Sequence, residues 1–135
     1  MLRQAVLFDG DDASGDVDLW ETNGTTAGTY ELTGISGAYS GGLFIYSPFF
    51  TVFNGEVLFE GADAGGHAEL WVTDGTSAGT HEVTGISGAW TGGLFNGGTP
   101  GFAVYNGEVL FDGTDASGNN NLWVTNGTAI PCRLI

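Results

Sequence analysis

Acidic residues gather in three short stretches that share one pattern. They begin at residues 9, 60 and 112, and each reads acid, Gly, any residue, Asp, two small residues, Gly. Ca²⁺ takes six to eight oxygen ligands, and glycine lets backbone carbonyls turn towards an ion. The spacing matches neither an EF-hand nor the glycine-rich Ca²⁺ nonapeptide. The candidate metal ligands are Asp9, Asp11, Asp12, Asp16, Asp63, Asp112 and Asp115. In the alternative interpretation, the central Asp of each loop caps its own backbone in a solvated turn.

Two aromatic residues, Tyr39 and Trp90, occupy equivalent places after the identical segments 34–38 and 85–89. An aromatic ring in a glycine-rich loop can stack on the apolar face of a sugar, while nearby Asp or Asn binds its hydroxyls. One such site per repeat gives avidity without tight individual sites. Tyr39 and Trp90 are therefore the candidate glycan-binding residues. The alternative is that both rings fill the core between repeats.

Other chemistries have little support in the sequence. Both histidines, His67 and His81, occur in the second repeat, and no ligand spacing typical of zinc accompanies them. No nucleophile elbow, phosphate loop or zinc-protease motif is present, and the repeats distribute carboxylates symmetrically, so we expect no enzymatic activity.

The charge of the chain restricts its partners. The chain has sixteen acidic residues, two arginines and no lysine, which gives a formal net charge of -14. Such a surface repels nucleic acid and anionic membranes. No apolar run is long enough to span a membrane, so no membrane insertion is expected. No segment at the start of the chain is typical of a signal peptide.

A repeat of about 51 residues organises the chain. The pair Leu-Trp recurs at Leu19, Leu70 and Leu122, which lie 51 and 52 residues apart. In the second repeat, the sequence predicts strands at 49–53, 57–59, 69–73 and 81–84. Asn54-Gly55 between the first two is a strong hairpin signal. Each repeat is therefore expected to be a four-stranded antiparallel meander.

The predicted fold is all-β, with one propeller-type blade per repeat. Leu70 and Val72 point to one side of their strand and Trp71 to the other, so both faces of the sheet need cover. The chain, residues 1–135, is expected to form a single repeat domain with blades at about 5–33, 49–84 and 102–135, the first lacking its first strand. Propellers usually close with four or more blades. Nearly three blades therefore predict a homo-oligomer, most simply a dimer of about six blades, or a piece of a longer array. A β-sandwich is the alternative fold.

At Glu69 to Thr80 the chain resembles the bacterial ELWxxDGTxxGT tandem-repeat family. The second copy carries every defined position of the motif, and the first and third copies carry most of them. The resemblance implies a propeller-like fold and an extracellular or cell-surface setting, and it implies no established activity. We therefore expect a non-enzymatic binding or adhesion module, with glycans as the ligand class. The alternative is a structural or engineered self-assembling module stabilised by Ca²⁺.

Overall fold

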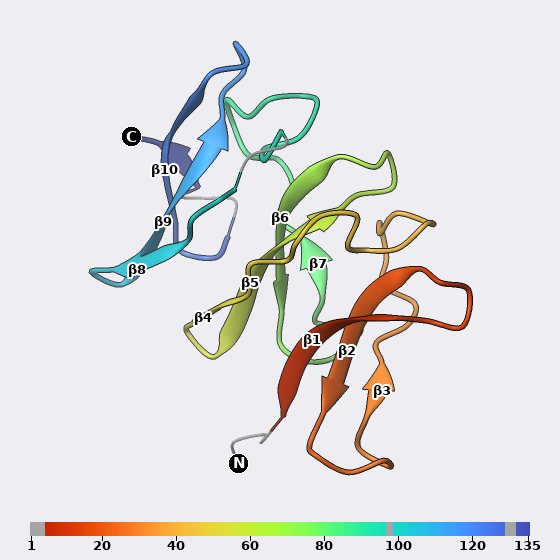
Figure 1. Cartoon of the computed structure of the whole chain (residues 1–135). Coiled ribbons are helices and arrows are strands. Elements are labelled where there is room, and N and C mark those ends of the chain that lie inside the picture. The colour runs from red at the N-terminus through yellow and green to blue at the C-terminus, as the bar shows by residue number, and fades with distance from the viewer. Residues whose placement is uncertain (1–4, 97–98, 129–131) are drawn as a thin grey trace.

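The protein consists of short antiparallel strands in three separate sheets, which follow one another from the N-terminus to the C-terminus (Figure 1). The computed structural model describes residues 5–96, 99–128 and 132–135. These residues contain eleven strands and no helix, so none of them lies in a helix able to cross a membrane. The strands are β1 (Val6–Asp11), β2 (Val17–Thr22), β3 (Tyr30–Glu31), β4 (Thr51–Phe53), β5 (Glu56–Ala62), β6 (Ala68–Thr73), β7 (His81–Glu82), β8 (Ala103–Tyr105), β9 (Glu108–Thr114), β10 (Asn120–Thr125) and β11 (Arg133–Leu134).

Each predicted repeat forms one meander. The first sheet has the order β1-β2-β3, the second β4-β5-β6-β7, and the third, read from its other edge, β8-β9-β10-β11. The all-β class is thus confirmed, and among the described residues the first sheet has three strands while the other two have four. A two-sheet sandwich does not describe this arrangement, because the described residues form three sheets.

Turn chemistry explains how consecutive strands pair. Asn54 and Gly55 join β4 to β5 with φ angles of 55° and 77°. Asn106 and Gly107 repeat this geometry between β8 and β9, with φ angles of 55° and 78°. Positive φ at both central residues is what a type I′ turn requires, and such turns match the twist of the flanking strands.

The two faces of the middle sheet carry different cores. Its Leu70 and Val72 pack in one buried cluster with Phe111 and Trp123 of the third sheet. Its Trp71 belongs to a second cluster with the first sheet. The alternation predicted along this strand is therefore confirmed. We call the side of a sheet that bears Leu19, Leu70 or Leu122 its leucine face, and the side that bears Trp20, Trp71 or Trp123 its tryptophan face.

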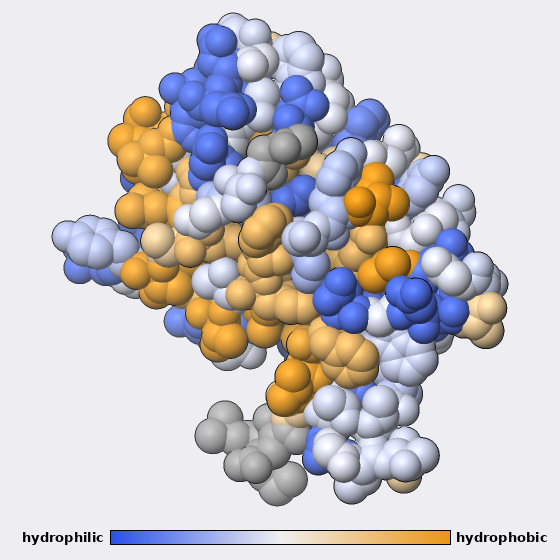
Figure 2. All heavy atoms as spheres, in the orientation of Figure 1, coloured by the Kyte–Doolittle hydropathy of each residue, from blue (hydrophilic) through white to orange (hydrophobic). Residues whose placement is uncertain are grey.

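The end sheets each leave one face open. The tryptophan face of the first sheet carries a stacked pair, Phe8 and Trp20, whose ring centroids lie 6.2 Å apart and which are both partly exposed. On the leucine face of the third sheet, Leu122 is 50% exposed, whereas Leu19 and Leu70 are 0% exposed. Hydrophobic side chains are visible at the surface around this third sheet in Figure 2. The two end sheets therefore each have one partly uncovered face, although Val124, on the leucine face of the third sheet, is 3% exposed.

Candidate functional site

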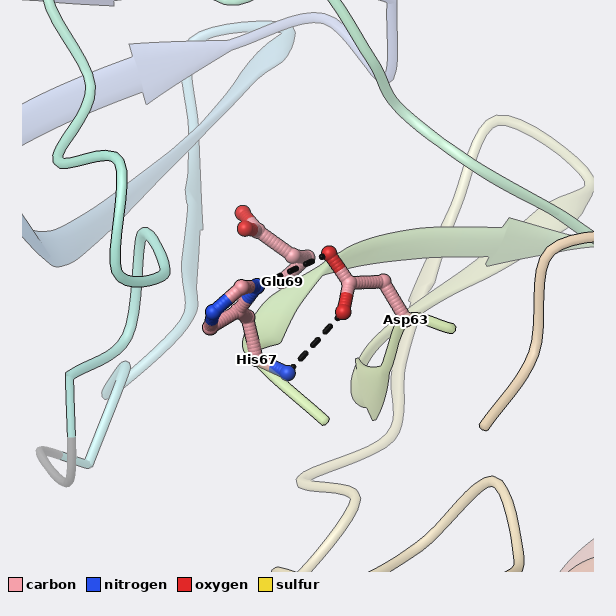
Figure 3. Close-up of side chains that lie close together, drawn as sticks. All are labelled: Asp63, His67 and Glu69. Atoms are coloured by element: carbon pink, nitrogen blue, oxygen red, sulfur yellow. Dashed lines mark hydrogen bonds and ion pairs between the residues drawn. The ribbon is translucent and has the colours of Figure 1, made fainter. Parts of the chain in front are cut away.

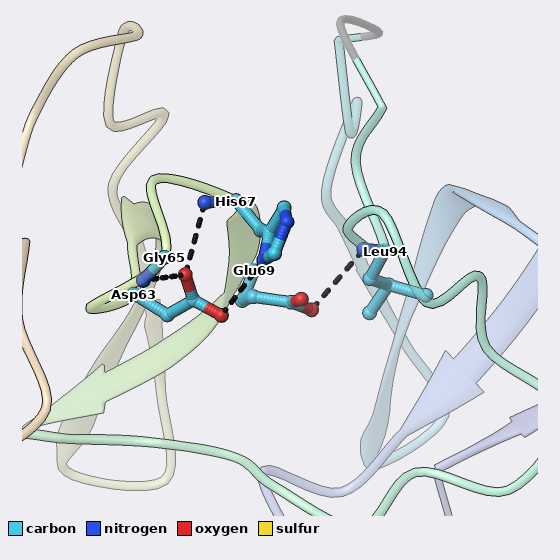
Figure 4. Close-up of polar contacts among 5 residues, drawn as sticks. All are labelled: Asp63, Gly65, His67, Glu69 and Leu94. Carbon is cyan, nitrogen blue, oxygen red and sulfur yellow. Dashed lines mark hydrogen bonds and ion pairs between the residues drawn. The ribbon is translucent and has the colours of Figure 1, made fainter.

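The acidic loops are held by their own aspartates. Asp63 Oδ1 accepts hydrogen bonds from the backbone N–H groups of Gly65 and His67, both at 2.9 Å (Figure 4). Asp12 accepts from two amides of its own loop at 2.7 and 3.0 Å, and Asp115 does so at 2.9 and 3.0 Å. These bonds are the ones expected if the central aspartate caps its own turn.

In the second repeat, Asp63, His67 and Glu69 come together at one end of the sheet (Figure 3). One potential ligand atom from each lies within 4.8 Å of the others, and His67 Nδ1 is 3.4 Å from Asp63 Oδ2. Burial raises the pKa of Glu69 to about 7, although the hydrogen bond from the Leu94 N–H opposes this rise. The group offers three ligand atoms, about half of what Ca²⁺ requires.

A related group of carboxylates occupies the same place in the first repeat, where Asp12, Asp18 and Glu31 lie within the same distance of one another. Burial is the main cause that raises the pKa of Asp18, and the charges of Asp12 and Asp16 raise it further. Burial also raises the pKa of Glu31, with a contribution from Asp18. This group contains no basic side chain. The three carboxylates at this end of the sheet therefore repel one another.

The third repeat replaces two of these acids. Asn121 stands where the other repeats have Asp18 and Glu69, and its Nδ2 donates a hydrogen bond of 2.7 Å to Asp115 Oδ2. Leu134 pairs with Trp123 in the position that Glu31 takes opposite Trp20. The acidic end group is therefore a feature of two repeats.

The predicted metal ligands are only partly brought together. Asp12 and Asp63 belong to the two groups described above, each with two partners that the sequence analysis did not select as metal ligands. The other predicted ligands, Asp9, Asp11, Asp16, Asp112 and Asp115, belong to no such group among the described residues. The signal for the missed partners was present, since Asp18 and Glu69 open the repeated Leu-Trp motif. Ca²⁺ binding by these loops stays a prediction.

Tyr39 and Trp90 occupy equivalent positions against the acidic loop of the following sheet. The Tyr39 N–H donates to the Ala62 carbonyl at 3.1 Å, and the Trp90 N–H donates to the Thr114 carbonyl at 3.0 Å. A Cβ placed on Gly66 would lie 3.5 Å from the Tyr39 ring, so the ring covers this loop glycine closely. Tyr39 is nevertheless 36% exposed, and Trp90 is partly exposed. Each ring thus combines a packing role with an accessible part.

A second kind of site was missed by the sequence analysis. The sequence Gly-Gly-Leu-Phe occurs twice, at 41–44 and 92–95, and each copy lies between two sheets. Leu94 N donates to Glu69 Oε1 at 3.1 Å (Figure 4), and Leu43 N donates to Asp18 Oδ1 at 2.9 Å. We call the place that receives such a segment, at the start of β2 or β6, a docking slot. Its signal in the sequence was the exact repetition of these four residues.

Backbone bonds hold each segment on both sides. The Phe95 N–H donates to the Ala68 carbonyl at 3.0 Å, and the Leu94 carbonyl accepts from Thr114 N at 2.7 Å in the next sheet. In the first slot, the Phe44 N–H donates to the Val17 carbonyl at 3.0 Å, and the Leu43 carbonyl accepts from Ala62 N at 2.7 Å. Each segment therefore joins two sheets through backbone hydrogen bonds, although it is not itself a strand.

Comparison of the chain with protein-family models, with curated proteins and with solved structures gives no match. The resemblance to the ELWxxDGTxxGT repeats accordingly rests on the motif alone.

Proposed function

We propose that the chain is a non-enzymatic, propeller-type binding module whose two open end faces are covered by further copies of the same repeat. Its expected setting is extracellular or at a cell surface, as the motif resemblance implies. The open faces form the contacts between copies, and the loops at the ends of the sheets are available to bind a ligand.

The observation that carries this proposal is the way in which the sheets follow one another. The leucine face of the first sheet packs on the tryptophan face of the second, which contributes Trp71. The leucine face of the second, with Leu70, packs in turn on the tryptophan face of the third, with Trp123. The two faces left open are one of each kind. A leucine face on one chain therefore finds its usual counterpart on another chain.

Such a contact joins unlike surfaces head to tail, and it forms a ring when the rotation between neighbouring sheets closes the circle. Two chains supply six sheets, which lies within the usual range for propellers. The mass of the chain in solution tests the proposal directly. A mass near that of two chains supports it, whereas a folded monomer at every protein concentration contradicts it.

Glycan binding is the proposed ligand function, because the Tyr39 and Trp90 rings are partly exposed beside acidic loops. Asp63 pairs with Ala38 in an isolated bridge, which places a carboxylate-bearing loop next to the Tyr39 segment. An aromatic face with neighbouring hydrogen-bond acceptors suits a sugar ring.

A glycan array tests this ligand class, with Tyr39→Ala and Trp90→Ala as variants. We expect each variant to bind less than the parent chain, and the double variant to lose binding, because the two sites act together. Tyr46→Ala, which alters another exposed aromatic residue, is the control and should bind as the parent does. If the parent chain gives no signal on the array, the glycan proposal is refuted, and the alternative of a purely structural module is favoured.

A further inference from the structure

We propose that the third sheet carries a third docking slot, at the start of β10, which binds an extended Gly-Gly-Leu-Phe segment presented by another repeat. The inference rests on the proposed stacking of repeats and specifies the peptide chemistry that the open leucine face recognises.

The third sheet provides the same binding groups as the two slots already described. Asn120 corresponds to Val17 and Ala68, whose carbonyls accept the Phe N–H of a bound segment. Asn121 corresponds to Asp18 and Glu69, whose side-chain oxygens accept the Leu N–H. Because Asn121 Nδ2 is held by Asp115, its Oδ1 is the acceptor left for an incoming N–H group.

A cavity that could receive a bound segment lies over these groups. A cavity of about 720 Å³ is lined by Leu110, Leu122, Asn120 and Asn121, together with Ala103 and neighbouring residues. Leu19 and Leu70 are fully buried where a Gly-Gly-Leu-Phe segment covers their sheet, and Leu122 is half exposed without one. Covering this apolar surface is favourable in proportion to the area removed from water.

The second glycine of the segment gives the slot its specificity. A Cβ on Gly93 would lie 2.9 Å from the Ala68 carbonyl oxygen, and one on Gly42 would lie 2.8 Å from that of Val17. Both glycines also have φ near +120°, which side chains rarely adopt. A third slot of the same design accepts glycine at this position and rejects alanine.

The chain contains two such segments, and the structure places both in the first two slots. The ligand of the third slot is therefore a segment from another repeat, one whose own slot does not already hold it. Adding an extended segment to backbone groups of a sheet, with a pocket for its side chains, is an established mode of peptide recognition.

The test uses the full chain and a synthetic peptide with the sequence of residues 91–96, Thr-Gly-Gly-Leu-Phe-Asn. Binding is followed by amide chemical shifts in NMR spectra and by titration calorimetry. We expect saturable shifts centred on Asn120, Asn121 and Leu122. The peptide with alanine in place of its second glycine should bind at least about tenfold more weakly, because overpacking a close contact reduces the binding free energy.

Two variants of the chain sharpen the test. Leu122→Asp places a charge in the slot and should abolish binding, while Val104→Asp should bind as the parent does. Val104 is 54% exposed, but it pairs with Val109 on the other face of the same sheet. Equal binding of both peptides, shifts centred elsewhere, or no shifts at all would overturn the proposal.

The outcomes also separate this proposal from the proposed assembly. If the chain is monomeric and still binds the peptide, the slot stands and the assembly is refuted. If the chain associates and the peptide neither binds nor dissociates the complex, the assembly stands and the slot is refuted.

Discussion

At the scale of single residues, Glu60 is unusual because its carboxyl group is buried. It lies in β5, is 1% exposed, and its Oε1 has no hydrogen-bond partner among the described residues. Burial raises the pKa of Glu60 from 4.5 to about 7. It also lines a cavity of about 490 Å³ with Asp9, which occupies the equivalent strand position in the first repeat. A buried carboxyl without a partner favours its neutral form.

This carboxyl should make stability depend on pH. The folded chain keeps a proton on Glu60 that the unfolded chain releases, so the free energy of unfolding decreases as pH rises from about 4.5 to about 7. Glu60→Gln removes this contribution and should raise the melting temperature more at pH 8 than at pH 5.

Thermal unfolding at the two pH values measures the effect, with Glu56→Gln at the start of the same strand as the matched control. A Glu60→Gln variant that shows the same change in melting temperature between the two pH values as the parent chain would contradict the assignment.

At the scale of elements, the segments 41–44 and 92–95 connect neighbouring sheets by hydrogen bonds and by packing. Each donates a backbone hydrogen bond to the sheet that precedes it and accepts one from the sheet that follows it, and each places a Leu and a Phe in the core between sheets. The aromatic contacts continue this packing, with the Phe95 ring centroid 5.6 Å from that of Phe111 and 5.8 Å from that of Phe102. The spacing between sheets thus depends on these short segments.

Gly93→Ala should destabilise the fold by more than the strain of placing alanine at a positive φ angle would account for. Gly93 has both positive φ and a contact that leaves no room for a methyl group, whereas Gly85 has positive φ with open space around it. We expect Gly93→Ala to lower the free energy of unfolding by about 1–3 kcal/mol more than Gly85→Ala, because only the first forces atoms into the Ala68 carbonyl. Chemical denaturation measures both values, and equal losses would argue against the close contact.

The strands were predictable because their signals are local. Asn54-Gly55 encodes its turn within two residues, and the alternation of Leu70, Trp71 and Val72 encodes two covered faces within three. The predicted strand 57–59 extends to β5 at Glu56–Ala62, and the predicted strand 81–84 shortens to β7 at His81–Glu82, since pairing with a neighbour decides where a strand ends.

The candidate sites were less predictable because they depend on contacts distant in sequence. Glu69 accepts a hydrogen bond from Leu94, 25 residues away, and no local pattern specifies that contact. By composition the two Gly-Gly-Leu-Phe segments belong to glycine-rich loops, and only the three-dimensional arrangement shows what they contact. The self-capping of Asp63, by contrast, is local and was among the stated alternatives.

At the scale of the whole molecule, the open ends and the charge act against each other. The uncovered leucine and tryptophan faces favour association, while a formal net charge of -14 opposes it. If the chain associates as proposed, Leu122→Asp should shift it to a monomer, because the substitution adds a charge to the face that the proposed contact buries.

Sedimentation or light scattering over a range of protein concentrations measures this change. Val104→Asp, on the opposite face of the same sheet, is the control with the same added charge and should associate as the parent chain does. If both variants behave alike, repulsion between whole chains rather than the leucine face controls association.

The two unlike ends have a further consequence for growth. A contact between unlike ends contains no stop signal of its own, so a third chain can add wherever a second one did. Only geometry limits the process, since six sheets close when each is turned by about 60° from the last. In the proposed assembly, a small change in that angle, produced for example by a bulkier residue at position 93, would turn a closed ring into an open helical fibre.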